Sequence, residues 1–355
     1  MIYKSNNMNV DSIKINKNAS ILQALEGINR NSKNSKSTLL VENDTHSIVG
    51  TITDGDIRRA LLSGLSINDT IESVYNKDFS YIREEEHDFK KLKEFRDRGV
   101  RILPVLDCDS KLIRILDLKE IRSLLPVECM IMAGGRGARL SPLTDTIPKP
   151  MLLLGGKPII EHNIDRLISY GIRNIYISVK YLGEQIVEYF GDGSSKGIEI
   201  KYIWEEEPLG TAGALSLIDK VESDYFLVMN SDLFTNVDFE QLYLDMIEHK
   251  ADMVVSSIEY QVDIPYAVCE VNENKVTDFK EKPTYIYYSN AGIYMFRKEL
   301  IKSIPKNTFY NITDLMEKLV KEGDNLIYSP IIGYWIDIGK PIDYKKAQEF
   351  IKHLE

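Results

Sequence analysis

The chain has 355 residues, of which 43% are hydrophobic, and its formal net charge is −10 at pH 7. This length predicts two or three domains, and the apolar fraction is sufficient for packed cores. The acidic charge excludes a protein that binds nucleic acid nonspecifically. The three cysteines form no C-x-x-C pair, which argues against a zinc knuckle or a disulfide framework. There is no signal-peptide pattern and no apolar run of about 18 residues, so we expect a cytoplasmic protein.

Residues 1–125 contain a weak internal duplication. The strings T-I-T-D-G-D-I-R-R and I-L-D-L-K-E-I-R align so that Asp56 matches Glu120, 64 positions later. A strand-like run precedes each string, and a helix-like pattern precedes each run. Pro126 ends the region, because proline disfavours helix in the residue before it. We therefore predict two repeats, about 1–65 and 66–125, followed by a further domain over 126–355.

The string T-D-G-D-I-R-R resembles the signature of cystathionine-β-synthase (CBS) domains, which usually form pseudo-symmetric, α+β pairs. The resemblance implies that Thr53 and Asp56 bind the phosphate and ribose of a nucleotide, typically an adenine nucleotide. A hydroxyl can donate to phosphate, and a carboxylate can accept from both ribose hydroxyls. In the second repeat Asp117 and Glu120 take these positions, and a carboxylate would repel phosphate, so we expect at most one nucleotide site. The alternative is a module that only dimerises the protein.

The segment from Met130 reads M-I-M-A-G-G-R-G-A-R-L-S-P-L-T-D-T-I-P-K-P-M-L-L-L-G-G-K-P. It begins within an apolar run, 127–132, that predicts a buried strand. Glycines allow a tight turn that exposes N–H groups to an anion. Arginines and Lys149 add positive charge, so the segment predicts a polyphosphate-binding loop; the alternative is a surface turn with solvated arginines. Pro158 excludes a Walker loop, and Leu140 excludes a dinucleotide fingerprint.

Helix-like and strand-like patterns alternate after this segment. We expect helices over 159–170 and 183–190, and strands over 175–179, 198–204 and 225–229. The alternation predicts a parallel α/β sheet with helices on both faces. As the fold class we expect a Rossmann-like domain whose sheet is mixed but mainly parallel. Ligands of such sheets bind beyond the carboxyl ends of the strands. The glycine segment, the string E-E-E-P-L-G-T-A-G and Asp232 should therefore converge on one crevice.

Two further features follow. Asp232 comes directly after an apolar strand, where a carboxylate can bind Mg²⁺ together with substrate phosphates; the alternative is a helix N-cap. The segment Pro265–Pro283 predicts a β-hairpin around Asn272–Asn274. It ends in Glu281-Lys282-Pro283. The alternative to a binding role for Glu281 and Lys282 is an ordinary surface ion pair.

The string G-G-x-G-x-R-L-x-P-L-T…P-K-P-M-L resembles the sugar-1-phosphate nucleotidyltransferases, and the resemblance extends over about 127–355. It implies that Arg139 and Lys149 are catalytic. It also implies that Asp232 and Asp337, the second in the string W-I-D-I-G, bind Mg²⁺. The nucleotide-binding residues that it implies are Ala133, Gly134, Gly135, Gly137, Glu207, Gly210 and Thr211. Those for the sugar phosphate are Tyr266, Glu281, Lys282, Asn290 and Gly292, although Ala267 stands where relatives commonly have glycine.

The reaction that the resemblance implies is attack of a sugar 1-phosphate on the α-phosphorus of a nucleoside triphosphate, with release of pyrophosphate. The nucleophile needs no general base, because the second pKa of a phosphate monoester is about 6. The string P-L-G-T-A-G resembles that of sugar-1-phosphate guanylyltransferases, and a CBS pair in front of such a domain resembles the arrangement in guanylyltransferases of amino sugars. The two resemblances favour GTP and a hexosamine or related sugar 1-phosphate as substrates. The alternatives are UTP, dTTP or CTP, and a catalytically inactive nucleotide-sugar sensor. Both families tend to dimerise, so we expect a homo-oligomer.

Overall fold

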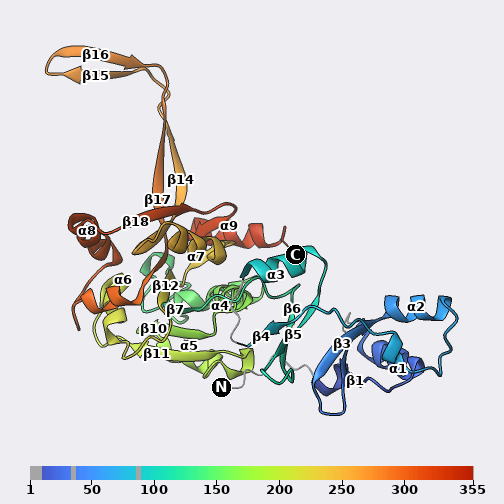
Figure 1. The fold of residues 1–355 in the computed structure, drawn as a ribbon. Coiled ribbons are helices and arrows are strands. Elements are labelled where there is room, and N and C mark those ends of the chain that lie inside the picture. The colour runs from blue at the N-terminus through green and yellow to red at the C-terminus, as the bar shows by residue number, and fades with distance from the viewer. Residues whose placement is uncertain (1–9, 33–36, 85–88, 355) are drawn as a thin grey trace. The chain divides into compact units, whose positions relative to one another are not determined.

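The computed structural model describes residues 10–32, 37–84 and 89–354 (Figure 1). Two compact units form. The first ends at Leu124 and includes Ser194–Ile198, and the second comprises Leu125–Gly193 and Glu199–Glu355. In the part of the chain that the structure describes, no helix has both the length and the apolar character needed to cross a bilayer.

The first unit contains two three-stranded sheets of the same topology. In each sheet, the central strand pairs with a parallel strand on one side and an antiparallel strand on the other. The antiparallel pairing of the first sheet recurs in the second at an offset of 64 residues, including the irregularity beside Glu42 and Leu106. The strands are β1 (Lys14–Asn16), β2 (Thr38–Glu42), β3 (Ile48–Thr53), β4 (Ile82–Arg83), β5 (Ile102–Leu106) and β6 (Leu112–Asp117).

The two repeats share part of one core. Buried side chains of the first repeat, such as Leu40 and Ile52, pack in the same cluster as Ile102 and Ile115 of the second sheet. A smaller cluster around Leu103 completes the second repeat. The helices of this unit are α1 (Ile21–Ser32), α2 (Asp54–Leu62) and α3 (Phe89–Asp97).

A seven-stranded sheet forms the centre of the second unit, with strand order β11-β10-β7-β12-β17-β14-β18. All neighbouring strands are parallel except at β17, which is antiparallel to both β12 and β14. The predicted mixed, mainly parallel sheet is thus confirmed. The strands are β7 (Val127–Met132), β10 (Asn174–Val179), β11 (Glu199–Trp204), β12 (Tyr225–Asn230), β14 (Met253–Asp263), β17 (Thr284–Arg297) and β18 (Leu326–Pro330).

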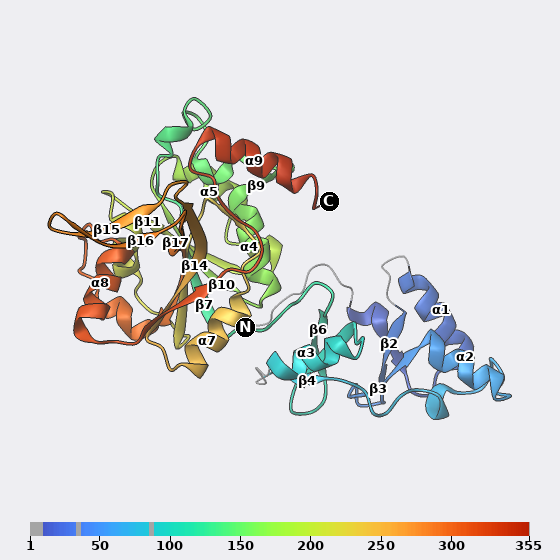
Figure 2. The same ribbon diagram turned by 90° about the horizontal axis from the view of Figure 1, so that it is seen from above.

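Helices cover the sheet (Figures 1 and 2). On one face, Ala212 of α6 and Leu315 of α8 are buried against strand residues that include Phe226 and Tyr294. The predicted helix over 159–170 is α4, which ends one residue earlier, with Tyr170 at its C-cap. The helices are α4 (Ile159–Ser169), α5 (Gly183–Phe190), α6 (Gly210–Gly213), α7 (Phe239–Glu248), α8 (Ile312–Glu322) and α9 (Pro341–Ile351).

Strands β14 and β17 continue beyond the sheet as a two-stranded ribbon. After an irregularity between Val255 and Ser257, they pair without interruption from Ile258–Ser289 to Asp263–Thr284. The chain between them forms the hairpin β15 (Val268–Asn272) and β16 (Lys275–Lys280), as the sequence predicts. We call residues 258–289 the arm. Figure 1 shows the arm extending away from the sheet of its own unit.

Candidate active site

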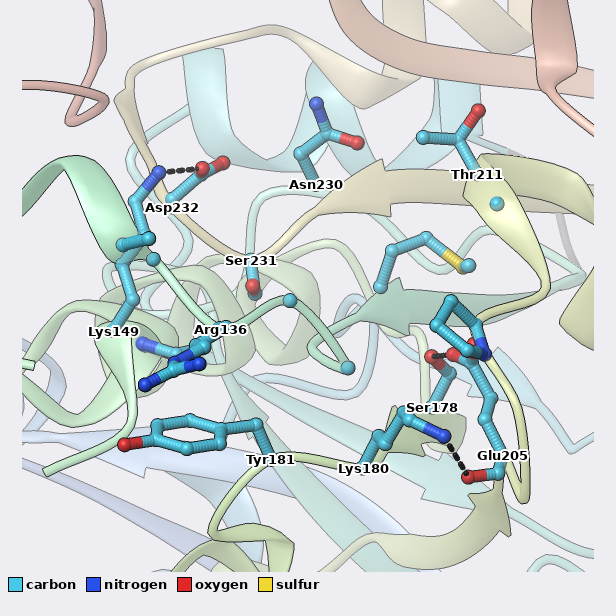
Figure 3. Close-up of a pocket in the computed structure, with 18 of the residues that line it drawn as sticks. Arg136, Lys149, Ser178, Lys180, Tyr181, Glu205, Thr211, Asn230, Ser231 and Asp232 are labelled. Carbon is cyan, nitrogen blue, oxygen red and sulfur yellow. Dashed lines mark hydrogen bonds and ion pairs between the residues drawn. The ribbon is translucent and has the colours of Figure 1, made fainter. Parts of the chain in front are cut away.

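A cavity of about 720 Å³ lies at the carboxyl ends of β7, β10, β11 and β12 (Figure 3). Its position agrees with the rule that open α/β sheets bind ligands beyond the ends of their parallel strands. The glycine segment, the turn before α6 and the residues after β12 meet there, as the sequence predicts. The lining residues are Met132, Gly134, Gly135, Arg136, Gly137, Ala138, Arg139, Lys149, Pro150, Ser178, Lys180, Tyr181, Glu205, Pro208, Gly210, Thr211, Asn230, Ser231, Asp232 and Phe309.

The glycine turn after β7 depends on its missing side chains. Gly137 has φ +66°, and a Cβ there would lie 2.9 Å from the Cβ of Lys149. The hydroxyl of Thr144 donates to the carbonyl of Gly137 at 2.9 Å, which ties the turn to the following loop. Ala133 does not line the cavity: it is 1% exposed, and its N–H donates to the carbonyl of Ser178 at 3.0 Å.

Positive side chains surround the turn. The guanidinium of Arg136 lies 5.6 Å from the ring centroid of Tyr181, a cation–π contact visible in Figure 3. The Tyr181 hydroxyl donates to the carbonyls of Thr144 and Asp145 at 3.2 and 3.0 Å. Tyr181 therefore holds both the loop and the arginine at the edge of the cavity.

An acidic pair, Asp232 and Asp337, lies next to Lys149. Strands β13 (Leu233–Thr235) and β19 (Trp335–Asp337) pair antiparallel, which brings Asp232 beside the end of β19. The N–H of Ile338 donates to the carbonyl of Asp232 at 3.0 Å. Two residues that are about a hundred positions apart in sequence thus become neighbours.

The charges in this region interact. Lys149 forms an ion pair with Asp232 (Figure 3). Burial raises the pKa of the Asp337 carboxyl, and the charge of Asp232 raises it further, whereas Lys149 and Arg139 lower it. Arg139 and Asp337 both approach Gly339, because a Cβ there would lie 3.5 Å from the Asp337 carboxylate and 3.7 Å from an Nη of Arg139.

The acidic pair is suited to Mg²⁺, which usually takes one or two protein carboxylates and completes its shell with water and substrate phosphates. The charge of Asp232 raises the pKa of Asp337. A bound dication would offset the repulsion between these two carboxylates. Among the described residues no group of three or more His, Cys, Asp and Glu side chains is arranged as a metal site. Asp232 and Asp337 would therefore supply the protein ligands, and the substrates the remainder.

Glu205 belongs to the cavity, although the sequence reasoning selected Glu207. The carboxylate of Glu205 accepts from the Ser178 hydroxyl at 2.6 Å and from the N–H of Leu209 at 3.0 Å. It lies so near the glycine turn that a Cβ on Gly134 would be 2.7 Å from its Oε1. Glu207 is exposed and lies outside the lining. Three consecutive glutamates carry no signal that tells which one faces inward.

The turn before α6 forms another wall of the cavity. Gly210 has φ +76°, and a Cβ there would lie 2.8 Å from the carbonyl oxygen of Tyr310. The hydroxyl of Thr211 accepts from the N–H of Ile312 at 2.9 Å. These contacts hold the segment before α8 against the turn, and they place Phe309, 61% exposed, at the cavity rim.

The residues predicted for the sugar phosphate separate into two groups. Gly292 lies against Asn230, a residue of the cavity lining, because a Cβ on Gly292 would be 2.5 Å from the Asn230 Nδ2, but Gly292 itself does not line the cavity. Asn290 accepts from the N–H of Gly292 at 2.9 Å. Tyr266, Glu281 and Lys282 are exposed on the arm and do not line the cavity.

In the first unit, Thr53 and Asp56 contact each other. Thr53 caps α2, and its hydroxyl donates to Asp56 at 2.6 Å. Thr53 also lines a separate hollow with Ser37 and Arg58. In the second repeat Asp117 is buried and accepts from Arg101 at 3.3 Å, so an internal cation neutralises the carboxylate that replaces Thr53.

The fold and the cavity define an α/β domain with a glycine turn, several cations and a carboxylate pair at the strand ends, which are groups suited to phosphoryl ligands. Residues 128–353 match the family model described as "Nucleotidyl transferase", so the chain belongs to the nucleotidyl transferase family. Residues 7–63 match the CBS domain. The predicted nucleotidyltransferase family and the predicted CBS domain are confirmed, and the CBS match covers the first of the two predicted repeats.

Two relatives and one solved structure illustrate the match. The chain is 33% identical to the mannose-1-phosphate guanylyltransferase of Mycobacterium tuberculosis over 231 residues, 62% of this chain and 63% of the relative. It is 32% identical to the bifunctional protein GlmU of Methanocaldococcus jannaschii over 232 residues, 63% of this chain and 54% of the relative. HddC from Yersinia pseudotuberculosis complexed with GMP-PN is 28% identical, with a TM-score of 0.50 over 63% of this chain and 99% of that chain. The chain thus spans less than two thirds of the length of the two relatives.

Proposed function

We propose that the protein transfers a nucleoside monophosphate, with GTP as the favoured donor, to a hexosamine or related sugar 1-phosphate. A phosphate oxygen of the sugar attacks the α-phosphorus of the triphosphate, and the bond to the β-phosphate breaks. Pyrophosphate leaves with the bonding electrons. The observation that carries this proposal is that Arg139, Lys149 and Asp232 line one cavity beside the glycine turn. Asp337, which does not line that cavity, lies next to Asp232 because β13 and β19 are paired.

The chain's own residues act by positioning and charge neutralisation, because two anions must meet and more charge must leave. The glycine-turn amides and Arg139 bind the triphosphate. Lys149 stabilises charge on the α-phosphate. Asp232 and Asp337 would hold Mg²⁺, which when bound would neutralise phosphate charge. No histidine or serine nucleophile is required, since the attacking phosphate is already ionised.

Glu205 supports the choice of GTP. A carboxylate is an acceptor-only group, and after its bonds to Ser178 and Leu209 each of its oxygens retains accepting capacity. Guanine presents two adjacent donors, N1–H and the exocyclic amine, whereas uracil and thymine present a single N–H between two carbonyls. A buried, oriented carboxylate therefore matches guanine best. The resemblance to guanylyltransferases supports the same base.

Pyrophosphate release tests the proposal. Purified protein is assayed with GTP, UTP, dTTP or CTP against a panel of hexose and hexosamine 1-phosphates in the presence of Mg²⁺. We expect the highest kcat/KM for GTP with an amino sugar. A preference for UTP or dTTP would contradict the assignment of Glu205. No release from any pairing would instead support an inactive nucleotide-sugar sensor.

The first unit is proposed to bind one nucleotide at Thr53 and Asp56 and to regulate turnover. The neutralised Asp117 supports a single site, because the second repeat presents an internal ion pair at the equivalent place. Calorimetry with AMP, ATP and GTP on the full chain tests this, with the Thr53→Ala variant as the comparison. Equal binding by both proteins would remove the site.

A further inference from the structure

The segment that precedes α8, residues 308–311, is held by its main chain against the turn before α6. The N–H of Tyr310 donates to the carbonyl of Leu209 at 2.9 Å. The carbonyl of Tyr310 accepts from the N–H groups of Ala212 and Gly213, both at 3.0 Å. Because both main-chain polar groups of Tyr310 are used, the chain beside residue 309 has a fixed path.

Two glycines allow this segment to approach the turn closely. A Cβ on Gly213 would lie 2.6 Å from the carbonyl oxygen of Thr308, and a Cβ on Gly210 would lie 2.9 Å from the Oδ1 of Asn311. Both distances are shorter than real Cβ atoms show. The first and last residues of the segment are thus fitted against glycines, and residue 309 lies between them.

Phe309 is the residue that this arrangement presents to the cavity. Its side chain is 61% exposed, and it belongs to the cavity lining together with Pro208 and Gly210. An aromatic side chain on a fixed main chain loses little entropy when it binds, because only two torsion angles remain to be ordered. The ring is therefore a preorganised apolar surface for a flat group of a ligand.

The same turn connects Phe309 to the carboxylate of Glu205. Leu209 is the link, because its N–H donates to Glu205 at 3.0 Å and its carbonyl accepts from the N–H of Tyr310 at 2.9 Å. A nucleobase carries its hydrogen-bonding groups at its edge and an apolar π surface on its face. A carboxylate for the edge and a ring for the face complement each other at one base.

Phe309 also lies away from the ion pair of the cavity. Figure 3 shows Glu205 and Thr211 on one side of the cavity and Lys149 with Asp232 on the other. Thr211 is tied to the segment of Phe309, because its hydroxyl accepts from the first N–H of α8 at 2.9 Å. A nucleotide whose phosphates bind near Lys149 would extend its base toward the side that carries Phe309.

We propose that Phe309 stacks on the nucleobase of the donor and selects purine over pyrimidine nucleotides. The inference rests on the proposed function, in which Glu205 contacts the edge of the base. A purine has two fused rings and covers more of the phenylalanine face than a single pyrimidine ring does. Phe309 favours both purines, whereas Glu205 distinguishes them, because the N1 of adenine is an acceptor and would face an acceptor-only carboxylate.

Nucleotide binding to the full chain tests the role of the ring. Calorimetry with GTP and with UTP, in the presence of Mg²⁺ and without sugar 1-phosphate, compares the wild type with Phe309→Ala. We expect the Kd for GTP to rise roughly 5- to 150-fold, the scale for removing an aromatic side chain from a stacked base. The Kd for UTP should rise less. Circular dichroism verifies that each variant is folded.

Phe279→Ala is the matched control for the loss of an exposed ring. This phenylalanine is 65% exposed on the arm and does not belong to the cavity lining. Its replacement should leave the Kd for GTP and the Kd for UTP unchanged.

Substitutions that keep or remove the π surface separate stacking from apolar contact. Phe309→Trp should retain the affinity for GTP, whereas Phe309→Leu should lose affinity although leucine is apolar. Guanine stacked on the new indole should quench its fluorescence, beyond any change in the wild type, which has two tryptophans. The same titration of Phe279→Trp should show no additional quenching.

An unchanged Kd for GTP in folded Phe309→Ala, or an equal loss for GTP and UTP, would overturn the stacking role. Failure of Phe309→Trp to show quenching would overturn it as well. In pyrophosphate release, kcat of Phe309→Ala at saturating GTP should stay within about twofold of the wild type, because the stack is the same before and during the reaction.

Binding and turnover separate this inference from the proposed function. If the wild type releases pyrophosphate but Phe309→Ala binds GTP as tightly as the wild type, only the inference fails. If the wild type binds GTP but releases no pyrophosphate with any sugar 1-phosphate, the proposed function fails. Weaker GTP binding by Phe309→Ala would still support the inference in that case.

Discussion

Replacement of Glu205 by glutamine should lower kcat/KM for GTP more than for any other nucleotide. The glutamine must keep its oxygen on the N–H of Leu209, since its amine would repel that donor, so the amine faces Ser178 and the cavity. One N–H donor of guanine then faces the amine of the glutamine, which is also a donor, and loses its hydrogen bond. The loss of one hydrogen bond to a charged group costs about 1.5–3 kcal/mol. This corresponds to a decrease of roughly 10- to 150-fold in kcat/KM for GTP.

The assay is pyrophosphate release with GTP and UTP at fixed sugar 1-phosphate, with circular dichroism as the check on folding. The ratio of kcat/KM for GTP to kcat/KM for UTP should decrease. Glu206→Gln is the matched control and should keep the wild-type ratio, because this neighbouring glutamate is exposed and does not line the cavity. An unchanged ratio in a folded Glu205→Gln protein would refute the proposal that Glu205 contacts the base.

Three further predictions concern the phosphate side of the cavity. Lys149→Ala and Asp232→Asn should each reduce turnover by at least ~10² with folding intact, the scale for loss of one preorganised electrostatic group, and wild-type rates in either would contradict their roles. Gly137→Ala should reduce kcat/KM for the triphosphate by about tenfold or more, because an alanine at this positive φ and in contact with Lys149 would strain the turn. Thermal denaturation of the variant distinguishes a local change in the turn from global unfolding. A chelator should abolish pyrophosphate release and excess Mg²⁺ restore it, whereas activity that persists in the chelator would show that the acidic pair needs no metal.

Some of the site could be predicted because short-range patterns carry its physics. Glycine conformations and apolar strand lengths are local properties, so the glycine turn and the carboxylate after β12 were found from the sequence. Parallel strands then place their carboxyl ends together, so the convergence of Gly134, Gly210 and Asp232 on one crevice followed from topology alone. The internal duplication could also be predicted from the sequence. The offset of 64 residues between Asp56 and Glu120 is also the offset between the β2–β3 pair and the β5–β6 pair.

The sequence by itself determined which chemical groups are available and the order of the strands that carry them. Tertiary structure alone decided that Glu205 faces the cavity: its N–H continues the ladder from β11 to the carbonyl of Val179 at 3.0 Å, and this fixes the direction of its side chain. Pairing between distant strands likewise determined that Asp337 approaches Asp232. The position of Lys282 depended on how far β14 and β17 stay paired, a long-range property that the hairpin pattern does not contain.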